Sequence, residues 1–346
     1  MVRGDAPGAE GARAVSRRVL VTGASGMLGG AVATALRDRG DDVRAFQRRP
    51  AGLPGVRDVQ GSLTDADDVR RAAEGVDAIV HLAAKVSFAG PEEEFRAVNV
   101  DGTRHVLDAL RAHGGGRLVN ISSPSVAHLG TSIVGLDATP ADPERARGSY
   151  ARTKAAAELE AMAADGTDDL LVTSLRPHIV WGPGDTQLVG RIVDRGRRGT
   201  LPILDDGMAL IDTTYVDNAA SAIVAGLDAI EDVHGESFVI TNGEPRTVRD
   251  VLGGFCEAAG VARPSRRIPG SLARLAGRVV EKVWEIRPGE DEPPMTEFLA
   301  EQMSTAHWFD QRRTRERLRW TPAVNFDEGL ERLSRWFAEH PVVGSA

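Results

Sequence analysis

Residues 22–30 read TGASGMLGG, and this stretch decides the fold. It follows an apolar run at residues 18–22 and leads into a helical pattern. Gly23, Gly26 and Gly29 let the backbone turn tightly and approach a pyrophosphate, whose charge is stabilised by the N–H groups at a helix N-terminus. The spacing is Gly-x-x-Gly-x-x-Gly, which alone also fits a purely structural turn. Its position after the first strand of an alternating pattern predicts a dinucleotide site.

Short β-branched runs alternate with amphipathic stretches through the first half of the chain. The runs occupy residues 18–22, 42–46, 77–82, 117–122 and 170–177. Such alternation is typical of βαβ units and a parallel sheet. These crossovers favour an open sheet over a barrel, which needs eight such units. The predicted fold class is α/β, a Rossmann-type doubly wound parallel sheet with a smaller C-terminal substrate lobe.

After the fifth run the pattern changes to Gly- and Pro-rich loops and isolated helices, with one helix-strand return. We expect residues 18–180, plus about 215–242, to form a dinucleotide-binding domain. Residues 181–214 plus 243–340 are expected to form the substrate lobe. Residues 1–17 lack the apolar core of a signal peptide and are expected to be a disordered leader.

The end of the second predicted strand selects between the two nicotinamide dinucleotides. An acidic residue there bonds the ribose 2'-hydroxyl of NAD, whereas an arginine accommodates the 2'-phosphate of NADP. Residues 45–49 read AFQRR and contain no carboxylate. Arg48 and Arg49 therefore favour NADP(H). NAD(H) stays open as the alternative, because the two arginines also fit a solvated loop.

Tyr150 and Lys154 lie four residues apart in the segment YARTK, and therefore on one face of a helix that continues through Glu158. A phenol with a pKa of about 10 transfers protons poorly at neutral pH until a nearby cation favours its phenolate. Lys154 is expected to supply that cation. The pair predicts acid-base chemistry by Tyr150, with a structural helix pair as the alternative.

Hydroxyl groups follow the predicted strand at residues 117–122. Ser123 and Ser125 lie at the carboxyl edge of the sheet, where ligands of such folds bind. A hydroxyl there can orient a substrate carbonyl. A serine cluster after a strand is by itself more often a turn, so Ser123 is a candidate only in the company of Tyr150 and the glycine loop.

The overall composition is that of a folded, enzyme-sized chain. Of its 346 residues 42% are hydrophobic and 27% charged, and the formal net charge is −8, which argues against disorder and against nucleic acid as a partner. The single cysteine, Cys256, excludes an internal disulfide and fits a reducing compartment. No run approaches the roughly 18 apolar residues of a transmembrane segment, so a cytoplasmic location is expected. The histidines are scattered, and no metal site is expected.

One helical pattern in the second half carries a long apolar stripe, with Arg274, Arg278 and Lys282 on its other faces. The stripe is expected to pack onto the lobe core. A pocket for a lipophilic substrate and contact with a membrane surface are the alternatives. Its members are Leu272, Leu275, Ala276, Val279, Val280, Val283 and Trp284.

Taken together, the glycine loop, Ser123, Tyr150 and Lys154 resemble the extended short-chain dehydrogenase/reductase family, and within it the 3β-hydroxysteroid dehydrogenase branch. The likeness covers about residues 18–338. Further motifs shared with the family are HLAAK at 81–85, NVDGT at 99–103, RPHIVWGPG at 176–184 and YVDNA at 215–219. The segments FQR at 46–48, PSVAH at 124–128, ITNGEP at 240–245 and TEFLAEQ at 296–302 look like those of the NADPH-dependent reductases of 2-alkyl-3-oxoalkanoates in bacterial olefin and β-lactone pathways.

The resemblance implies a role for each matching residue. Tyr150 would be the general acid and Ser123 would bond the carbonyl oxygen. Lys154 would lower the pKa of Tyr150 and hold the nicotinamide ribose, and Asn99 would support the site from the next helix. The implied cofactor residues are Gly23, Ser25, Gly26, Met27, Leu28, Arg48, Arg49, Ser62, Leu63, Ala83, Ala84, Lys85, Asn99, Tyr150, Lys154, Pro177, Ile179 and Val180. The proposed substrate residues are Ser125, Phe88, His128 and Trp181.

Two positions depart from the family's pattern. Gly61-Ser62-Leu63 stands where the family has Gly-Asp-Leu, so the carboxylate that normally holds adenine is missing. His178 occupies a position that varies in the family and is expected to be a pocket wall.

The expected reaction is the NADPH-dependent reduction of a long-chain 2-alkyl-3-oxoalkanoic acid to the 3-hydroxy acid. The alternative among enzymes is an NAD-dependent 3β-hydroxysteroid dehydrogenase. The alternative from another class is a noncatalytic dinucleotide-sensing protein. The expected partner is a lipophilic small molecule, and peripheral contact with a membrane is left open. The resemblance also implies a homodimer through helices near residues 92–111 and 150–164.

Overall fold

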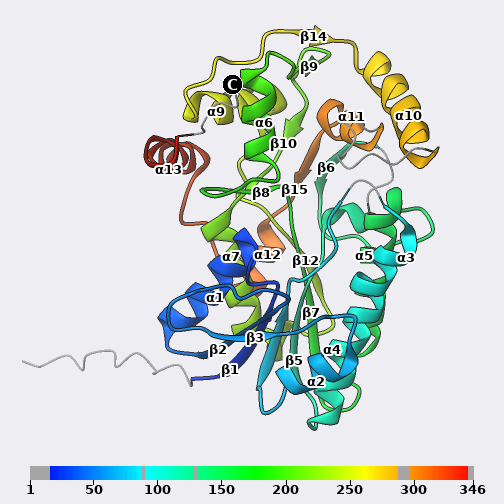
Figure 1. Cartoon of the computed structure of the whole chain (residues 1–346), viewed down its shortest axis with the longest axis vertical. Coiled ribbons are helices and arrows are strands. Elements are labelled where there is room, and N and C mark those ends of the chain that lie inside the picture. Colours follow the sequence, from blue (N-terminus) through cyan, green and yellow to red (C-terminus); the bar gives the residue numbers. More distant parts are fainter. Residues whose placement is uncertain (1–15, 88–89, 128–130, 287–296, 342–346) are drawn as a thin grey trace, which may run out of the picture.

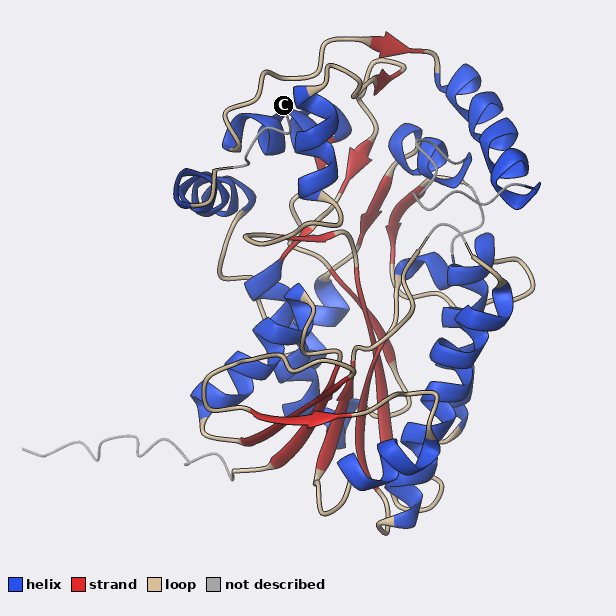
Figure 2. Ribbon diagram, in the orientation of Figure 1, coloured by secondary structure: helices blue, strands red, loops and turns tan. Residues whose placement is uncertain are grey.

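The computed structural model describes residues 16–87, 90–127, 131–286 and 297–341. Its centre is a seven-stranded sheet of order β12-β7-β5-β4-β1-β2-β3, in which every neighbouring pair is parallel. Figure 2 shows helices on both faces of this sheet. The predicted Rossmann-type doubly wound sheet is confirmed. The strands are β1 (Arg18–Thr22), β2 (Asp42–Gln47), β3 (Arg57–Gln60), β4 (Ala78–His81), β5 (Gly116–Ile121), β7 (Leu170–Pro177) and β12 (Ser237–Ile240).

Both faces of the sheet are covered, which is why its central strands read as continuous apolar runs. In β1, Val19 and Val21 pack in a core with α1, α7 and α8. Leu20 points to the opposite face and packs with α2, α4 and α5. These helices are α1 (Met27–Arg39), α2 (Ala66–Ala72), α4 (Gly102–Ala112), α5 (Gly148–Ala163), α7 (Val216–Asp228) and α8 (Ile230–Val233); shorter turns are α3 (Glu92–Phe95), η1 (Arg96–Asp101) and η2 (Pro124–Ala127).

The sheet changes its direction of winding at β1. The chain runs outward from β1 to β2 and β3, and then returns to place β4 on the other side of β1. In open sheets of this kind, ligands bind at the carboxyl ends of the strands where the order reverses. The glycine loop leaves the carboxyl end of β1, and therefore lies at this switch point.

A smaller lobe forms the upper part of Figure 1. Its core holds Trp181, whose ring lies 4.9 Å from that of Phe255 and 5.3 Å from that of Phe326 between centroids. The strands of the lobe and its connections are β6 (Ile133–Leu136), β8 (Val180–Trp181), β9 (Ile203–Leu204), β10 (Leu210–Ile211), β11 (Thr214–Tyr215), β13 (Arg246–Thr247), β14 (Arg267–Ile268) and β15 (His307–Phe309). The helices of the lobe are α6 (Val189–Arg197), α9 (Val248–Ala258), α10 (Gly270–Ile286), α11 (Glu297–Ser304) and α13 (Phe326–Glu339). Helix α12 (Arg312–Leu318) packs instead on the main sheet beside α7, α8 and β12, where Leu318 is part of the core.

One strand of the main sheet, β3, has no counterpart among the predicted runs. Its four residues are exposed or half-buried, and it pairs only with β2 at the sheet edge. An edge strand that buries so little has no apolar run to reveal it. The connection from β2, residues 48–56, contains no helix.

The orientation of α10 overturns the expectation that its stripe packs onto the lobe core. Ala273 and Gly277 are buried, and Ala273 packs with Ala300 of α11. Leu272 and Leu275 are 57% and 58% exposed, and Val279 is as exposed as Leu272. Ala273 and Gly277 therefore face the protein, whereas Leu272, Leu275 and Val279 face away from it. The side chains of Val283 and Trp284 lie outside the described residues.

Candidate active site

The glycine loop forms a backbone cradle at the start of α1. Gly23 has a φ of 77°, and a Cβ there would lie 2.9 Å from the backbone of Ala83. A Cβ on Gly29 would lie 2.2 Å from the carbonyl oxygen of Gly23. Gly26 is the N-cap of α1 and, lacking a side chain, leaves the first N–H groups of the helix without a side-chain cap. This geometry fits the pyrophosphate of a dinucleotide.

The neighbouring predicted cofactor residues continue this cradle. Ser25 is exposed in the loop, and Ala84 is half-buried after β4. Met27 and Leu28 begin α1 and pack partly against the lobe core. The start of α1 therefore touches both the loop and the lobe.

The loop after β2 presents Arg48 and Arg49, which are both exposed. Asp58 on β3 holds the loop in place, because Gln47 Nε2 and the Ala51 N–H each donate to its Oδ1 at 2.8 Å. The carboxylate on the neighbouring strand is thus engaged by the loop itself. What the loop offers to a ligand is a pair of guanidinium groups.

Ser62 lies in a loop held by a carboxylate from α2. Its N–H donates to Asp68 Oδ2 at 2.9 Å, and its hydroxyl lies 2.7 Å from Thr64 Oγ1. The hydrogen bond from Ser62 is the main cause that lowers the pKa of Asp68. Leu63 is buried. Asp68 of α2 thus brings a carboxylate to this loop, where it accepts a hydrogen bond from the backbone.

Tyr150 lies near the N-terminus of α5 and faces the end of β5. Burial raises the pKa of Tyr150, and its hydrogen bond with Ser123 acts in the opposite direction. Ser125 supports the pair, since its hydroxyl donates to Ser123 Oγ at 3.0 Å. A protonated phenol beside a fixed hydroxyl is an arrangement suited to an oxygen that gains negative charge.

Lys154 lies one helical turn after Tyr150 and is buried. Its Nζ donates to the carbonyl oxygen of Ile121 at 2.6 Å. Burial lowers the pKa of Lys154 to about 8, with Glu158 acting in the opposite direction. Burial is the main cause acting on the pKa of Tyr150, and the ammonium of Lys154 is directed at the end of β5, so the lowering of that pKa by Lys154 stays a prediction.

His81, at the end of β4, is part of the framework under the site. Its Nδ1 lies 2.8 Å from Thr22 Oγ1 and its Nε2 lies 3.2 Å from Thr103 Oγ1. Burial, and then the charge of Lys154, lower the pKa of His81 to about 3. The neutral ring therefore joins β4 to β1 and α4.

Asn99 lies in the π-helical turn η1, a geometry frequent at functional sites. Its Oδ1 accepts the Lys85 N–H at 2.7 Å, and its Nδ2 donates to Thr153 Oγ1 at 3.0 Å. Lys85 also pairs with Glu94 and lies 5.1 Å from the ring centroid of Phe95. Asn99 thus joins the loop after β4 to the helix that carries Tyr150.

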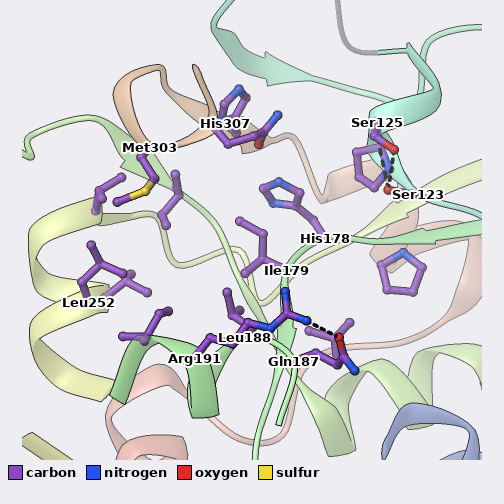
Figure 3. A pocket seen from close by; sticks show the side chains of 18 of the residues that line it. Ser123, Ser125, His178, Ile179, Gln187, Leu188, Arg191, Leu252, Met303 and His307 are labelled. Carbon is purple, nitrogen blue, oxygen red and sulfur yellow. Dashed lines mark hydrogen bonds between the residues drawn. The ribbon is translucent and has the colours of Figure 1, made fainter. Parts of the chain in front are cut away.

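A cavity of about 530 Å³ opens beside Tyr150 and extends into the lobe (Figure 3). Its catalytic end carries hydroxyl groups from Ser122, Ser123, Ser125 and Tyr150. Its far walls are mainly apolar, which suits a lipophilic ligand with a polar reacting end. The apolar wall residues include Ile192, Leu201, Ile211, Val248, Val251, Leu252, Phe255, Met303 and Phe309.

The segment after β7 supplies one wall of the cavity through Pro177, Ile179 and Val180. His178 is also a wall residue, and its Nδ1 lies 2.5 Å from the carbonyl oxygen of Asp212. Ile179 has a φ of 45°, a strained conformation for a β-branched residue. The strained turn sets these side chains against the cavity.

Trp181 does not take the substrate position expected of it. It is fully buried in the lobe core, where its Nε1 donates to Thr213 Oγ1 at 2.9 Å. The sequence next to the motif does not indicate whether the ring of Trp181 points into the cavity or into the lobe core. The other two expected substrate residues, Phe88 and His128, lie outside the described residues.

The polar residues of α6 were not found by sequence reasoning. Arg191 and Arg195 both line the cavity, and Gln187 stands before them at the same helical spacing. The spacing can be seen in residues 187–195, QLVGRIVDR. Nothing in the local sequence indicates that this helix lines the same cavity as Tyr150, so the spacing could not be recognised as part of the site before the fold was known.

Within residues 16–87, 90–127, 131–286 and 297–341, no helix has the length and apolar character needed to cross a membrane. The same ranges contain no group of three or more His, Cys, Asp or Glu side chains arranged to hold a metal ion.

The sheet, the glycine loop and the Ser123–Tyr150–Lys154 arrangement define a dinucleotide-dependent enzyme. The chain belongs to the NAD dependent epimerase/dehydratase family, which matches residues 19–241. It is an NAD(P)-dependent oxidoreductase of the extended short-chain dehydrogenase/reductase type.

Curated relatives cover nearly the whole chain. A 2-alkyl-3-oxoalkanoate reductase of Stenotrophomonas maltophilia is 39% identical over 91% of this chain and 98% of its own length. A protein of the same name from Shewanella oneidensis is 35% identical over 90% of this chain and 84% of its own. A 3 beta-hydroxysteroid dehydrogenase/Delta 5-->4-isomerase of Mycobacterium tuberculosis is 32% identical over 90% and 88%.

Solved structures share the fold. MoeE5 in complex with UDP-glucose and NAD superposes with a TM-score of 0.73 at 25% identity, over 94% of this chain and 100% of that one. The crystal structure of gox2253 gives a TM-score of 0.75 at 25% identity, over 94% and 99%.

Proposed function

We propose that the protein is an NADPH-dependent reductase that converts a long-chain 2-alkyl-3-oxoalkanoic acid to the 3-hydroxy acid. The observation that carries this proposal is the cavity, which has Ser123 and Tyr150 at one end and long apolar walls at the other. Two alkyl chains need such walls, and the ketone between them needs the hydroxyl end. The similarity to two 2-alkyl-3-oxoalkanoate reductases supports the same substrate class.

The residues of the site suit reduction. Bound NADPH supplies the hydride that the ketone carbon accepts. Tyr150 donates its proton to the carbonyl oxygen as charge develops there; because burial raises its pKa, the phenol is protonated at neutral pH. Ser123, held by Ser125, donates to the same oxygen. Lys154, fixed on the backbone of β5, provides the positive charge that stabilises the phenolate left behind.

Cofactor binding and substrate binding belong to two different parts of the chain in this proposal. Residues 18–180 and about 215–242 hold the dinucleotide, and residues 181–214 and 243–340 form the substrate lobe. The cavity supports the division, because its hydroxyl end comes from the first part and most of its apolar walls come from the second.

NADP(H) is the proposed cofactor, in preference to NAD(H). Arg48 and Arg49 are exposed at the end of β2, where a ribose 2'-phosphate would lie. Asp58, the carboxylate on the adjacent strand, accepts hydrogen bonds from the loop that carries them. It therefore holds the loop that carries the two arginines.

The direct test is to follow NADPH consumption with a 2-alkyl-3-oxo acid and, in parallel, with a 3-oxosteroid. We expect turnover of the acid. Turnover of the steroid alone, with NAD as the better cofactor, would establish the rival 3β-hydroxysteroid dehydrogenase activity, which the similarity to the mycobacterial enzyme keeps as the second candidate. Binding of NADPH with no turnover of either compound would favour a dinucleotide-sensing protein.

We also propose a homodimer through α3, α4 and α5. Leu159 on α5 is 44% exposed, and burial in a partner would remove it from water. Light scattering during size-exclusion chromatography should give twice the 36.9 kDa chain mass. A mass equal to that of one chain would contradict the dimer.

A last part of the proposal is that α10 rests on an anionic lipid surface. Leu272, Leu275 and Val279 are exposed on one side of the helix. Residues 264–280 contain no Asp or Glu, although the whole chain has a net charge of −8. Glu281 and Glu285 follow in the last turns of α10, so the positive charge belongs to this segment and not to the whole helix. An exposed apolar face beside basic residues is typical of proteins that lie in a membrane interface. The basic residues of this segment are Arg266, Arg267, Arg274 and Arg278.

A further inference from the structure

We propose that Arg191 and Arg195 of α6 form a carboxylate-binding subsite in the cavity, an inference that rests on the function proposed above. The two residues lie four apart and therefore on one face of the helix. Both are half-buried and both line the cavity. Figure 3 shows the guanidinium of Arg191 lying between Ile179 and Gln187.

The charge of the cavity wall supports an anionic ligand. Arg191 and Arg195 are the only Lys or Arg side chains among the described residues that line the cavity, and no Asp or Glu is found among those same lining residues. The chain as a whole has a net charge of −8. A cationic wall in an acidic protein attracts and orients an anion.

The residues around the two arginines favour the binding of an anionic ligand. Ile192 on α6 and Leu252 on α9 line the same cavity and belong to the apolar core of the lobe. In surroundings of low polarity a charge-assisted hydrogen bond between a guanidinium and an anionic ligand is strong. Arg191 Nη2 lies 3.3 Å from Gln187 Oε1, a bond to a neutral group that fixes the plane of the guanidinium. A planar fork of five donors matches a carboxylate in a bidentate manner.

The proposed substrate has the matching chemistry. A 2-alkyl-3-oxoalkanoic acid is ionised at neutral pH, and its carboxylate is attached to the carbon next to the ketone. With the ketone at Ser123 and Tyr150, the two alkyl chains occupy the apolar walls and the carboxylate needs a cation. Arg191 and Arg195 provide it, so the subsite selects acids over neutral ketones such as a 3-oxosteroid.

The experiment compares an acid with its neutral ester. A β-oxo acid loses carbon dioxide spontaneously, so the stable 2-alkyl-3-hydroxy acid and its methyl ester are bound to the NADP⁺-loaded protein and measured by calorimetry. Their oxidation by NADP⁺ is measured alongside. The variants are Arg191→Gln and Arg195→Gln. The matched control is Arg198→Gln, which removes an arginine of the same segment whose side chain is 65% exposed and pairs with Asp194.

We expect each pocket variant to weaken binding of the acid roughly tenfold or more, because a charge-assisted hydrogen bond is lost. Binding of the ester and the KM for NADP⁺ should stay unchanged, and Arg198→Gln should behave as the unmodified protein. Equal losses for acid and ester would overturn the subsite, because the arginines would then serve only to shape the cavity. A raised KM for NADP⁺ with unchanged acid binding would also overturn it, and would assign the arginines to the cofactor phosphates.

Failure of the proposed function gives a different result. If the protein oxidises a 3-hydroxysteroid and not the acid, the reductase proposal is wrong. The calorimetric comparison of acid and ester still decides the subsite in that case, since it requires no turnover. An acid that binds no better than its ester to the unmodified protein would reject the subsite.

Discussion

Tyr150 is the residue on which the proposed chemistry depends most directly. Replacing it with phenylalanine keeps the ring and removes the proton donor. We expect Tyr150→Phe to lower kcat by about 10²- to 10⁴-fold, the usual contribution of general acid catalysis. Stability should change by only about 1 kcal/mol, because one hydrogen bond with Ser123 is lost. Steady-state kinetics and a urea titration measure the two effects.

The other tyrosine of the chain provides a matched control. Tyr215 is buried in the lobe core and is absent from the cavity lining. Tyr215→Phe should therefore leave kcat unchanged. Full turnover by Tyr150→Phe would contradict the assignment of the general acid.

His81 makes the stability of the fold depend on pH. Its pKa in the folded state is about 3, whereas an unfolded histidine titrates near 6.5. Between these values the unfolded chain binds the proton and the folded chain does not, so the free energy of unfolding falls as pH falls below about 6.5. The loss attributable to His81 should be roughly 2 kcal/mol on going from pH 7 to pH 5. Urea titrations at the two pH values measure it, and His81→Gln should lose less; equal losses in both proteins would exclude His81 as the cause.

At the scale of elements, the glycine loop separates folding from cofactor binding. A Cβ on Gly29 would meet the carbonyl oxygen of Gly23 at 2.2 Å, whereas a Cβ on Gly26 would lie 3.5 Å from the same oxygen. Gly26 also has φ −86° and ψ 161°, which alanine adopts without strain. We therefore expect Gly29→Ala to lower the melting temperature of the protein without ligand. Gly26→Ala should keep the melting temperature and weaken the binding of NADPH, because the new methyl group lies where the pyrophosphate approaches.

Thermal melts with and without NADPH distinguish the two variants. The expected result is a normal melting temperature with little cofactor stabilisation for Gly26→Ala. Normal NADPH affinity in that variant would contradict the assignment of the loop as the pyrophosphate site.

The exposed face of α10 leads to a prediction of membrane binding. Flotation with vesicles that contain phosphatidylglycerol should carry the protein upward, and the double variant Leu272→Ser/Leu275→Ser should lose this binding. Vesicles of phosphatidylcholine alone should bind less, because the arginines of the segment then meet no anionic surface. Met208→Ser, which changes an exposed apolar residue outside α10 and outside the proposed dimer helices, is the control. If vesicle binding survives in the α10 variant and its mass in solution drops, the face is an interface between copies of the chain.

The elements that sequence predicts well are those with a local signal. The apolar runs gave the central strands because both of their faces are buried, and the four-residue spacing gave Tyr150 and Lys154 a common helix face. The strand β3 was not predicted, because its four residues are exposed or half-buried and form no apolar run. The α10 stripe was placed on the wrong side because periodicity shows that a helix has an apolar face, and not what that face meets.

At the scale of the whole molecule, the cavity is built from segments far apart in the chain. Ser123 follows β5, Arg191 lies on α6, Leu252 on α9 and His307 on β15. Only tertiary packing brings them together, so composition and spacing could identify the catalytic end of the site and not its far walls. Trp181 illustrates the same limit, since it lies next to the cavity segment in sequence and in the lobe core in space.

The stabilisation of the fold by each of the two dinucleotides should show which of them binds more tightly. A ligand that binds only the folded state stabilises it by about 2.7 kcal/mol when present at 100 times its Kd. If the exposed Arg48 and Arg49 meet the 2'-phosphate as proposed, NADP⁺ should raise the melting temperature more than NAD⁺ at equal concentration. The double variant Arg48→Gln/Arg49→Gln should remove this difference while keeping the response to NAD⁺, because the glycine loop is untouched. Equal shifts by the two dinucleotides in the unmodified protein would show that the two arginines form only a solvated loop, and the preference for NADP(H) would then be wrong.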